Sequence, residues 1–117
     1  PDSAEIAAFV RSFQKDDLRM TIDINHSNIH EDLTRVCDNC NGLIHNIHVS
    51  DNHGEWEDHL PPGTGVIDLK QTFSDLRRNG YTGPCNLEYR FEDFPALPTV
   101  ENLRRVREYV EQLLWER

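Results

Sequence analysis

The chain has 117 residues, the size of one domain with a single hydrophobic core. Its 12 lysines and arginines are outnumbered by 21 aspartates and glutamates, so the formal net charge is −9. This acidic balance excludes a nucleic-acid binder held mainly by charge, because such proteins gain affinity from basic groups that displace counterions. A mean hydropathy of −0.68, without an apolar run of about 20 residues, excludes a membrane-spanning helix.

The first part of the chain is predicted to form a strand between two helices. Helical spacing of apolar residues predicts a helix over residues 3–14, with Ser3 as its N-cap. A β-branched run predicts a strand over residues 18–24, and helical spacing returns over 29–41, where Gly42 is expected to end the second helix. The inward stripe of the first helix is predicted to consist of Ile6, Ala7, Val10 and Phe13.

A long polar loop divides the second part of the chain. It covers residues 50–66, follows a predicted strand at 43–49, and contains two prolines and three glycines. Loops of this length in compact domains are usually functional or disordered. Asp68 is expected to cap the next helix, which buries Leu69, Phe73 and Leu76 and ends at Asn79 and Gly80.

The chain closes with a predicted strand over residues 84–89 and a predicted helix over 99–115. The inward stripe of this last helix is predicted to consist of Val100, Leu103, Val106, Val110 and Leu114. Helices and strands thus alternate from end to end, which predicts an α/β fold with a parallel sheet and right-handed crossovers. In such folds the chemistry collects on the loops at the carboxyl ends of the strands.

Residues that can bind a metal ion lie at the ends of all three predicted strands. Asp23 lies at the end of the first strand and His26 just beyond it, His48 is at the end of the second, and Glu88 is at the end of the third. Carboxylates and imidazoles brought to one edge of a sheet would resist desolvation unless a cation neutralised them. Mixed oxygen and nitrogen donors suit transition metals better than Ca²⁺. The expected cofactor is a divalent metal ion: Mn, Zn, Co, Mg or Fe.

Several of these residues also have a purely structural interpretation. Asp23 could cap a turn or a helix, and His48 taken alone fits an interior histidine with a hydrogen-bond partner. Cys37 and Cys40 have the C-x-x-C spacing of a zinc or redox site. The four residues between Cys40 and His45 are too few to wrap an ion, which favours two small side chains near the end of a helix.

The glycines of the long loop allow two interpretations. The backbone amides of Gly63, Thr64 and Gly65 could hold a phosphate, or the two glycines could allow a tight turn. Two glycines after two prolines favour the turn.

Four segments, taken in chain order, carry a family resemblance: Asp23-x-x-His26, His45-x-x-His48-Val-Ser-Asp51-Asn52, Asp58-His59-Leu-Pro-Pro-Gly63-Thr-Gly65 and Leu87-Glu88. As a set they resemble the carboxy-terminal part of the xylose isomerase-like TIM-barrel superfamily. This group includes sugar isomerases and epimerases and the AP endonuclease family 2 enzymes. The resemblance runs from about residue 3 to the end of the chain.

The resemblance implies that Asp23, His48 and Glu88 are metal ligands from the sixth, seventh and eighth barrel strands. It further implies that Glu88 is a catalytic base. His26 matches a position that binds substrate in the epimerases and a further metal in the endonucleases, where His59 and Glu57 would complete the second site.

The expected substrate-binding residues are His26, His59 and Arg90. Arg90 follows Glu88 closely and is expected either to bind a substrate oxygen or to pair with Glu92.

The resemblance covers only part of a barrel. An eight-stranded (β/α)₈ barrel takes about 250 residues, so residues 1–117 are expected to form a partial domain from helix 5 through helix 8. Its open edges would expose unpaired backbone groups. We therefore expect a homo-oligomer or a complementing amino-terminal half-barrel to complete the fold. The second glutamate of the epimerases, which belongs to the fifth strand, is absent from this part.

Three functions stay open. The favoured one is a divalent-metal-dependent sugar or sugar phosphate isomerase or epimerase, which transfers a proton next to a metal-bound carbonyl. The second is an AP endonuclease-like metal-dependent phosphodiesterase, which the charge of −9 disfavours. The third is a non-catalytic barrel fragment or assembly module.

The expected partner is a small sugar or sugar phosphate, and neither nucleic acid nor a membrane is expected. The chain begins Pro1-Asp2-Ser3 without an apolar leader, and three cysteines are an odd number. We therefore expect a cytoplasmic protein without a disulfide framework.

Overall fold

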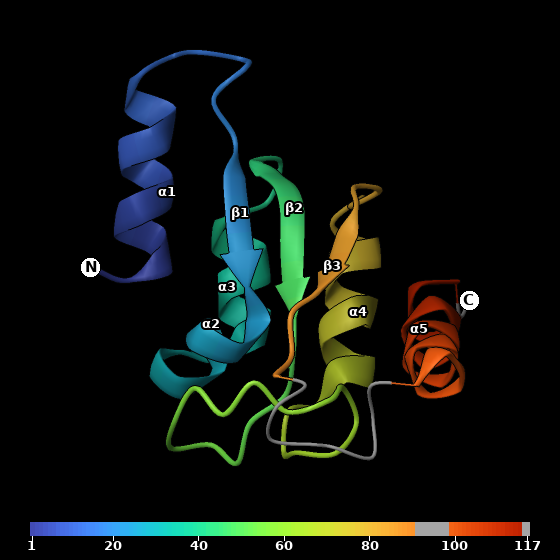
Figure 1. The fold of residues 1–117 in the computed structure, drawn as a ribbon. Helices are drawn as coiled ribbons and strands as arrows, with labels where there is room; N and C mark the ends of the chain where they lie inside the picture. The colour runs from blue at the N-terminus through green and yellow to red at the C-terminus, as the bar shows by residue number, and fades with distance from the viewer. Residues whose placement is uncertain (91–98, 116–117) are drawn as a thin grey trace.

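The structure, a computed structural model, describes residues 1–90 and 99–115, in which three parallel strands form one sheet (Figure 1). The strands are β1 (Met20–Asp23), β2 (Ile44–Val49) and β3 (Cys85–Leu87), and they lie in the order β1-β2-β3. β2 pairs in parallel with both neighbours, so all three carboxyl ends meet at one edge. The predicted parallel α/β arrangement is confirmed.

Among residues 1–90 and 99–115, the helices cover one face of the sheet and leave the other open. They are α1 (Ser3–Ser12), α2 (Ile24–His30), α3 (Leu33–Asn39), α4 (Leu69–Arg78) and α5 (Val100–Trp115). In Figure 1, α3 and α4 lie behind the strands, while α1 and α5 stand at the two sides of the sheet. Within residues 1–90 and 99–115, no helix combines the length and the apolar character needed to cross a bilayer.

The N-cap of α1 is Asp2 rather than Ser3, so that prediction was wrong. The Asp2 side chain accepts a hydrogen bond from the Glu5 amide, and the Glu5 carboxylate accepts one from the Asp2 amide, both at 2.9 Å. This reciprocal capping box satisfies two amides that the helix leaves free. Ser3 is buried instead, and its amide and hydroxyl each donate to the Glu31 carboxylate at 2.7 Å.

The helix predicted over residues 29–41 is divided in the structure: its first residues belong to α2, which begins before the predicted range, and its later residues form α3. α2 begins directly after β1, where the Asp23 side chain accepts a hydrogen bond from the His26 amide at 3.0 Å. Glu31 is extended, with φ −145° and ψ 161°, and ends α2. Asp32 then caps α3 by accepting from the Arg35 amide at 3.0 Å. Aspartate side chains compete with the helical hydrogen bonds and therefore divide the segment.

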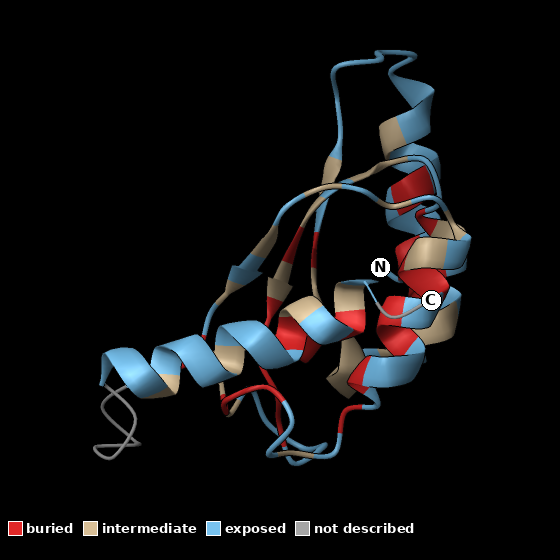
Figure 2. Cartoon of the chain, turned by 90° about the vertical axis from the view of Figure 1, so that its right-hand side faces the viewer, coloured by how far each residue is buried: buried red, intermediate tan, exposed pale blue. Residues whose placement is uncertain are grey.

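The core lies between the sheet and α4. Ile47 and Val49 of β2 are fully buried. The predicted stripe of α4 is at most 2% exposed at Leu69, Phe73 and Leu76, which confirms it. Asp68 is the N-cap of this helix, as predicted, and Asn79 is its C-cap. In Figure 2 the buried residues of the central helices gather on the sides that face the sheet.

The uncovered face of the sheet is polar. Alternation along the strands places Thr21, Asp23, Asn46 and His48 on this face, opposite Ile47 and Val49. Asn86 of β3 donates from its Nδ2 to Asn46 Oδ1 at 3.1 Å. This face can therefore stand next to water or to a polar interior without an apolar cover.

The terminal helices differ from α4, because parts of their predicted inward stripes are exposed. Ile6 of α1 and its C-cap Phe13 are 40% and 49% exposed, and Val100 and Leu103 of α5 are 73% and 37% exposed. α5 buries Val110 and Leu113, so only its carboxy-terminal half packs well (Figure 2). Among the described residues no strand lies beyond β1 or β3 to cover the rest.

Replacing Phe73 should be far more destabilising than replacing a phenylalanine on the open side of α1. Phe73→Ala leaves a cavity in the core and should lower the free energy of unfolding by about 3–5 kcal/mol. Phe9→Ala, at a residue that is 64% exposed, should lower it by less than about 1 kcal/mol. Urea denaturation followed by circular dichroism measures both. Similar losses for the two variants would contradict the assigned core.

Candidate metal centre

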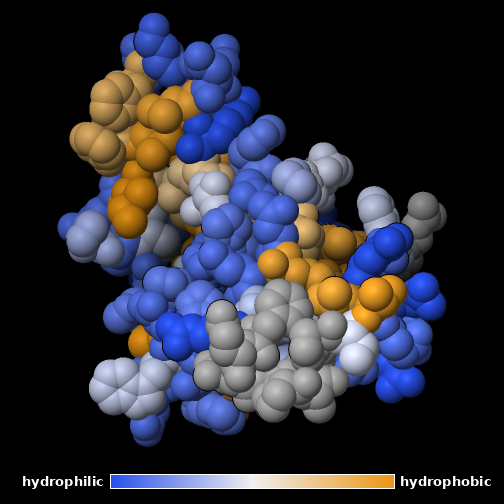
Figure 3. All heavy atoms as spheres, in the orientation of Figure 1, coloured by the Kyte–Doolittle hydropathy of each residue, from blue (hydrophilic) through white to orange (hydrophobic). Residues whose placement is uncertain are grey.

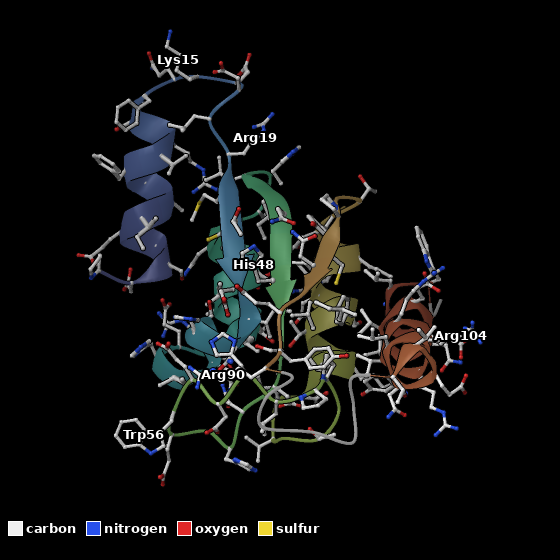
Figure 4. The ribbon with its side chains drawn as sticks, viewed as in Figure 1. Lys15, Arg19, His48, Trp56, Arg90 and Arg104 are labelled. Carbon is white, nitrogen blue, oxygen red and sulfur yellow. The ribbon has the colours of Figure 1, made fainter. Side chains whose placement is uncertain are left out.

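Asp23, His48 and Glu88 converge at the carboxyl ends of the three strands. One ligand atom from each lies within 4.8 Å of the other two. His48 Nδ1 is 2.8 Å from Glu88 Oε2 and 3.9 Å from Asp23 Oδ2. Figure 4 shows His48 on the open face of the sheet, toward these carboxyl ends. The parallel register explains the meeting, because it pairs Asp23 with His48 across β1 and β2.

The two oxygens of Asp23 have different roles. Oδ1 accepts the hydrogen bond that caps α2, while Oδ2 faces the ring nitrogens of His48 and His26 at 3.9 and 3.8 Å. The cap and the ligand interpretations of this residue are therefore compatible, since one oxygen serves each.

The chemistry of this group fits a divalent metal ion. Two carboxylates and one imidazole offer mixed oxygen and nitrogen donors, the set that Mn²⁺, Zn²⁺, Co²⁺ and Fe²⁺ accept. The Glu88 side chain is 50% exposed and that of Asp23 is 22% exposed, so the group is open on one side. Three protein ligands with an open side are typical of catalytic rather than structural sites.

A second group of possible ligands lies beside the first and consists of His26, Glu57 and His59. Ligand atoms of these three residues also lie within 4.8 Å of one another. His26 Nδ1 is 3.1 Å from Glu57 Oε1, and the His26 and His59 rings meet edge to face with centroids 5.9 Å apart. Because Asp23 Oδ2 approaches His26, the two groups share one continuous surface.

His59 ties the long loop to the end of β3. Its Nδ1 lies 3.0 Å from the Glu88 carbonyl oxygen, and its own carbonyl accepts from the Arg90 amide at 3.0 Å. The backbone of His59 has a φ of 50°, in the left-handed region that non-glycine residues rarely adopt. Such a conformation persists only where the surroundings hold it, and it is often found at functional sites.

Arg90 lies on the same edge of the sheet, just beyond the strand ends in the view of Figure 4. Its backbone amide donates a hydrogen bond to the His59 carbonyl oxygen, and Arg90 is exposed. The alternative partner, Glu92, lies outside the described residues.

A buried carboxylate, Asp51, organises the loop that carries Glu57 and His59. Asp51 is fully buried, and its two oxygens accept hydrogen bonds from four backbone amides. The donors lie 2.9–3.1 Å away and belong to Asn52, Gly63, Gly65 and Ile67. Its backbone also forms an antiparallel bridge with Leu60. These hydrogen bonds fold residues 50–66 back onto the Asp51 side chain.

The amides of Gly63 and Gly65 thus serve the Asp51 carboxylate, which supports the turn interpretation over a phosphate cradle. A Cβ on Gly65 would lie 2.2 Å from the Asn52 carbonyl oxygen and 2.3 Å from Asp51 Oδ1. A side chain at this position would therefore break the loop. Sequence reasoning assigned no role to Asp51, although an acidic residue between an apolar strand and a glycine-containing loop is a signal for one.

Buried amides join the loop to α2. Asn52 is fully buried, and its Nδ2 donates to the carbonyl oxygen and to Oδ1 of Asn25, at 3.0 and 2.7 Å. Asn25 in turn donates to the Ser50 hydroxyl at 2.9 Å. Fully satisfied buried polar groups rigidify their surroundings. This network holds α2, which carries His26, against the start of the loop.

The cysteines show no sign of ligand chemistry. Cys37 lies in α3 and Cys40 is its C-cap, and both thiols are buried and free. Burial raises the pKa of Cys37 to about 12 and also raises the pKa of Cys40. Both thiols stay neutral near pH 7, whereas metal binding and redox reactions use the thiolate. The structural interpretation of this pair is therefore favoured.

The family model described as xylose isomerase-like TIM barrel matches residues 2–113 of the chain. Among individual proteins, the uncharacterized protein MJ1614 of Methanocaldococcus jannaschii is 32% identical over 90 residues. The matched stretch is 77% of this chain and 35% of that protein.

Solved structures share the fold at low identity. A D-psicose 3-epimerase from Clostridium cellulolyticum H10, solved with D-tagatose, has a TM-score of 0.78 at 18% identity, over 96% of this chain and 43% of its own. The E. coli 3-keto-D-glucoside 4-epimerase YcjR gives 0.69 at 22%, over 95% and 38%. The IOLI protein, solved with a zinc atom, gives 0.77 at 18%, over 96% and 43%.

This likeness confirms the predicted fold, the three-stranded part of an α/β barrel. The chain spans less than half the length of the proteins that it resembles.

Removing the charge of Asp51 should loosen the loop. In Asp51→Asn an NH₂ group replaces one oxygen and faces amides that also donate, so the free energy of unfolding should fall by about 3 kcal/mol. Cleavage by a protease within residues 53–58 should become faster. Urea denaturation and timed proteolysis measure the two effects. Asp58→Asn is the matched control, because the Asp58 carboxylate contacts the backbone and ring nitrogens of the exposed His53 in the same loop; equal behaviour of both variants would argue against the clamp.

Proposed function

Because this chain belongs to the xylose isomerase-like TIM barrel family, we propose that it is the ligand-bearing part of a divalent-metal-dependent sugar isomerase or epimerase. Residues 1–117 would form the partial barrel domain that runs from helix 5 through helix 8. The observation that carries the proposal is the convergence of Asp23, His48 and Glu88 at the carboxyl ends of parallel strands.

Asp23, His48 and Glu88 would hold the metal ion. Asp23 is held in place by its cap on α2, and His48 is fixed on the central strand of the sheet. A bound divalent ion would supply Lewis-acid polarisation of a substrate carbonyl. The zinc atom in the similar IOLI protein supports this type of cofactor. Mn, Zn, Co, Mg and Fe all remain compatible with the donor set.

Glu88 is proposed as the catalytic base. Its carboxylate is half exposed on the open side of the group and can take a proton from a carbon next to the polarised carbonyl. Its Oε2 lies 2.8 Å from Nδ1 of His48, so one ion can be approached by both atoms. The opposing acid-base group, a glutamate of the fifth strand in the epimerases, would come from outside these residues.

His26, His59 and Arg90 are proposed to bind the substrate. These three residues lie next to Asp23, His48 and Glu88, on the side of the long loop. Their imidazole nitrogens and guanidinium can bind hydroxyl or phosphate oxygens. A polar small molecule suits this surface, and the similar solved structures include a D-psicose 3-epimerase with D-tagatose and a 3-keto-D-glucoside 4-epimerase. The substrate class is therefore a sugar or a sugar phosphate.

Titration with Mn²⁺ or Zn²⁺ should raise the melting temperature of the 117-residue chain, because an ion that binds the folded state stabilises it. Glu88→Gln and His48→Gln should each weaken binding by more than about tenfold, since even changes behind the ligands have effects of that size. Calorimetry measures the affinity. His45→Gln, an exposed histidine on the same strand β2, is the matched control. Absence of metal uptake by the wild-type chain would favour the non-catalytic module instead.

The second group, His26, Glu57 and His59, favours an AP endonuclease-like phosphodiesterase as the second candidate. A second metal ion beside the first would suit a phosphodiesterase, because two adjacent ions can stabilise the attacking and the leaving oxygen at a phosphate. The acidic net charge opposes this candidate, because DNA phosphates are repelled by it.

Metal stoichiometry and DNA binding distinguish the two candidates. For the isomerase we expect one ion per chain, no change of stoichiometry in His59→Gln, and no binding of an abasic DNA duplex at physiological salt. Two ions per chain, reduced to one in His59→Gln, together with binding of the abasic duplex, would replace the first candidate by the second. Elemental analysis and a gel-shift assay measure these properties.

A further inference from the structure

One aromatic side chain of α5 reaches the loop that carries Glu57 and His59. The helix α5 follows β3, and Figure 3 shows hydrophobic surface in orange where the two face each other. Tyr109 of the same helix packs on the backbone of Gly63 instead. A Cβ built on Gly63 would lie 2.9 Å from Cε1, 3.0 Å from Cζ and 3.2 Å from the hydroxyl oxygen of Tyr109. The ring therefore lies directly against the glycine, and a side chain at position 63 would clash with it.

The phenol of Tyr109 lies near the acidic side of the loop. Tyr109 is 37% exposed, so part of its ring is withdrawn from water. This burial raises the pKa of Tyr109, and the negative charges of Asp51 and Asp68 raise it further. The contact at Gly63 and the effect of these charges place the ring over the same part of the loop.

Gly63 is one of the four amide donors of Asp51. Its N–H lies 3.0 Å from Asp51 Oδ2, the oxygen that also accepts from the Gly65 amide. Its φ of 86° is in the left-handed region, which glycine adopts without steric cost. Glycine also has more backbone freedom to lose on folding than any other residue. A contact that limits this freedom at Gly63 therefore stabilises the loop, and Tyr109 supplies such a contact.

Asp51 also fixes the residue that follows His59. The backbones of Asp51 and Leu60 exchange two hydrogen bonds, at 2.8 and 2.9 Å. Leu60 is buried and comes directly after His59. Tyr109 and His59 are thus joined by packed and hydrogen-bonded neighbours, the kind of continuous network through which positions can be coupled.

The position of His59 decides which of its ring nitrogens is free. Nδ1 lies 3.0 Å from the Glu88 carbonyl oxygen. Because a carbonyl oxygen only accepts, Nδ1 has to carry the proton in this hydrogen bond. A neutral imidazole then has an unprotonated Nε2, which can bind a metal ion or accept from a hydroxyl group. Without the contact to Glu88, the two tautomers of His59 would mix.

We propose that Tyr109 is a positioning residue: by holding Gly63 in place, its ring keeps the loop around Asp51 in its folded conformation. His59 then remains on the Glu88 carbonyl, with Nε2 free for a ligand. Tyr109 acts through the loop and not on the ligand itself. The use of Nε2 by a substrate rests on the function proposed above, whereas the positioning of the loop does not.

The alternative is that Tyr109 only helps to pack α5. The neighbouring residue Val110 is 4% exposed and belongs to the hydrophobic core, so it anchors the same turn of the helix. Successive residues of a helix point about 100° apart. Replacing Tyr109 therefore tests the contact with the loop, and replacing Val110 tests the packing of the helix.

Hydrogen exchange in the metal-free 117-residue chain tests the proposal. In Tyr109→Ala the amides of Gly63 and Gly65 should exchange at least about tenfold faster, because the loop opens locally more often. Tyr109→Phe keeps Cε1 and Cζ and should exchange like the wild type. Val110→Ala is the matched control, which should lower the free energy of unfolding but leave these two amides protected. Exchange followed by NMR and urea denaturation measure the two effects.

The tautomer of His59 gives a second readout, which a packing role of Tyr109 would not change. At about pH 8, where imidazoles are neutral, nitrogen NMR should show the proton on Nδ1 of His59 in the wild type and in Tyr109→Phe. Tyr109→Ala should show a mixture of both tautomers. Tyr109→Leu repeats the test if Tyr109→Ala does not fold, because leucine keeps an apolar side chain but has no atoms in the places of Cζ and the hydroxyl group.

Two results would overturn the proposal. One is a folded Tyr109→Ala or Tyr109→Leu variant in which the exchange of Gly63 and the tautomer of His59 are those of the wild type. The other is an equal loosening of the loop in Val110→Ala, since the packing of α5 would then be enough to explain it. Failure of the proposed function would look different, as an absence of metal uptake, which none of these measurements uses.

Discussion

The edge of the sheet that carries the possible ligands depends on one buried carboxylate. Asp51 comes directly after β2 and collects four backbone amides, three of which lie 12 to 16 residues further along the chain. A buried ionised carboxylate is stable only when such donors replace its water. By satisfying this requirement the chain folds residues 50–66 into one defined loop. Glu57 and His59 reach the carboxyl ends of the strands because of that constraint.

Charge explains why the ligand-rich edge stays open. Asp23, Glu57 and Glu88 gather at this edge together with His26, His48 and His59, so three carboxylates share one small surface. Closing this edge with apolar residues would leave carboxylates buried without a counterion, which is costly. An accessible edge lets water, a cation or a polar ligand compensate the charge. The hydrogen-bonded network of the buried residues Asn25, Asn52 and Ser50 lies behind this edge. It holds α2 and the loop in place, while water or ligands at the exposed edge can exchange.

Sequence patterns predicted the strands, and the edge at which their carboxyl ends meet, better than the boundaries of the helices. The convergence of Asp23, His48 and Glu88 follows from parallel pairing alone, because each residue stands at the end of a strand in one sheet. The division at Glu31 and Asp32 was missed, since apolar spacing cannot show whether an aspartate will cap a new helix. The role of Asp51 was missed for a different reason: its partners are remote in sequence, and only the folded loop brings them to one side chain.

The possible ligands lie at one end of the sheet, away from its two side edges. The side edges are formed by β1 and β3, whereas the possible ligands lie at the carboxyl ends of the strands. The proposed proton transfer at a sugar carbon needs groups on both faces of the substrate, and among the described residues Glu88 is proposed for one side only. The opposing group would come from outside these residues. Under the proposed function, metal binding can therefore be tested on this chain by itself, whereas catalysis would need that second group.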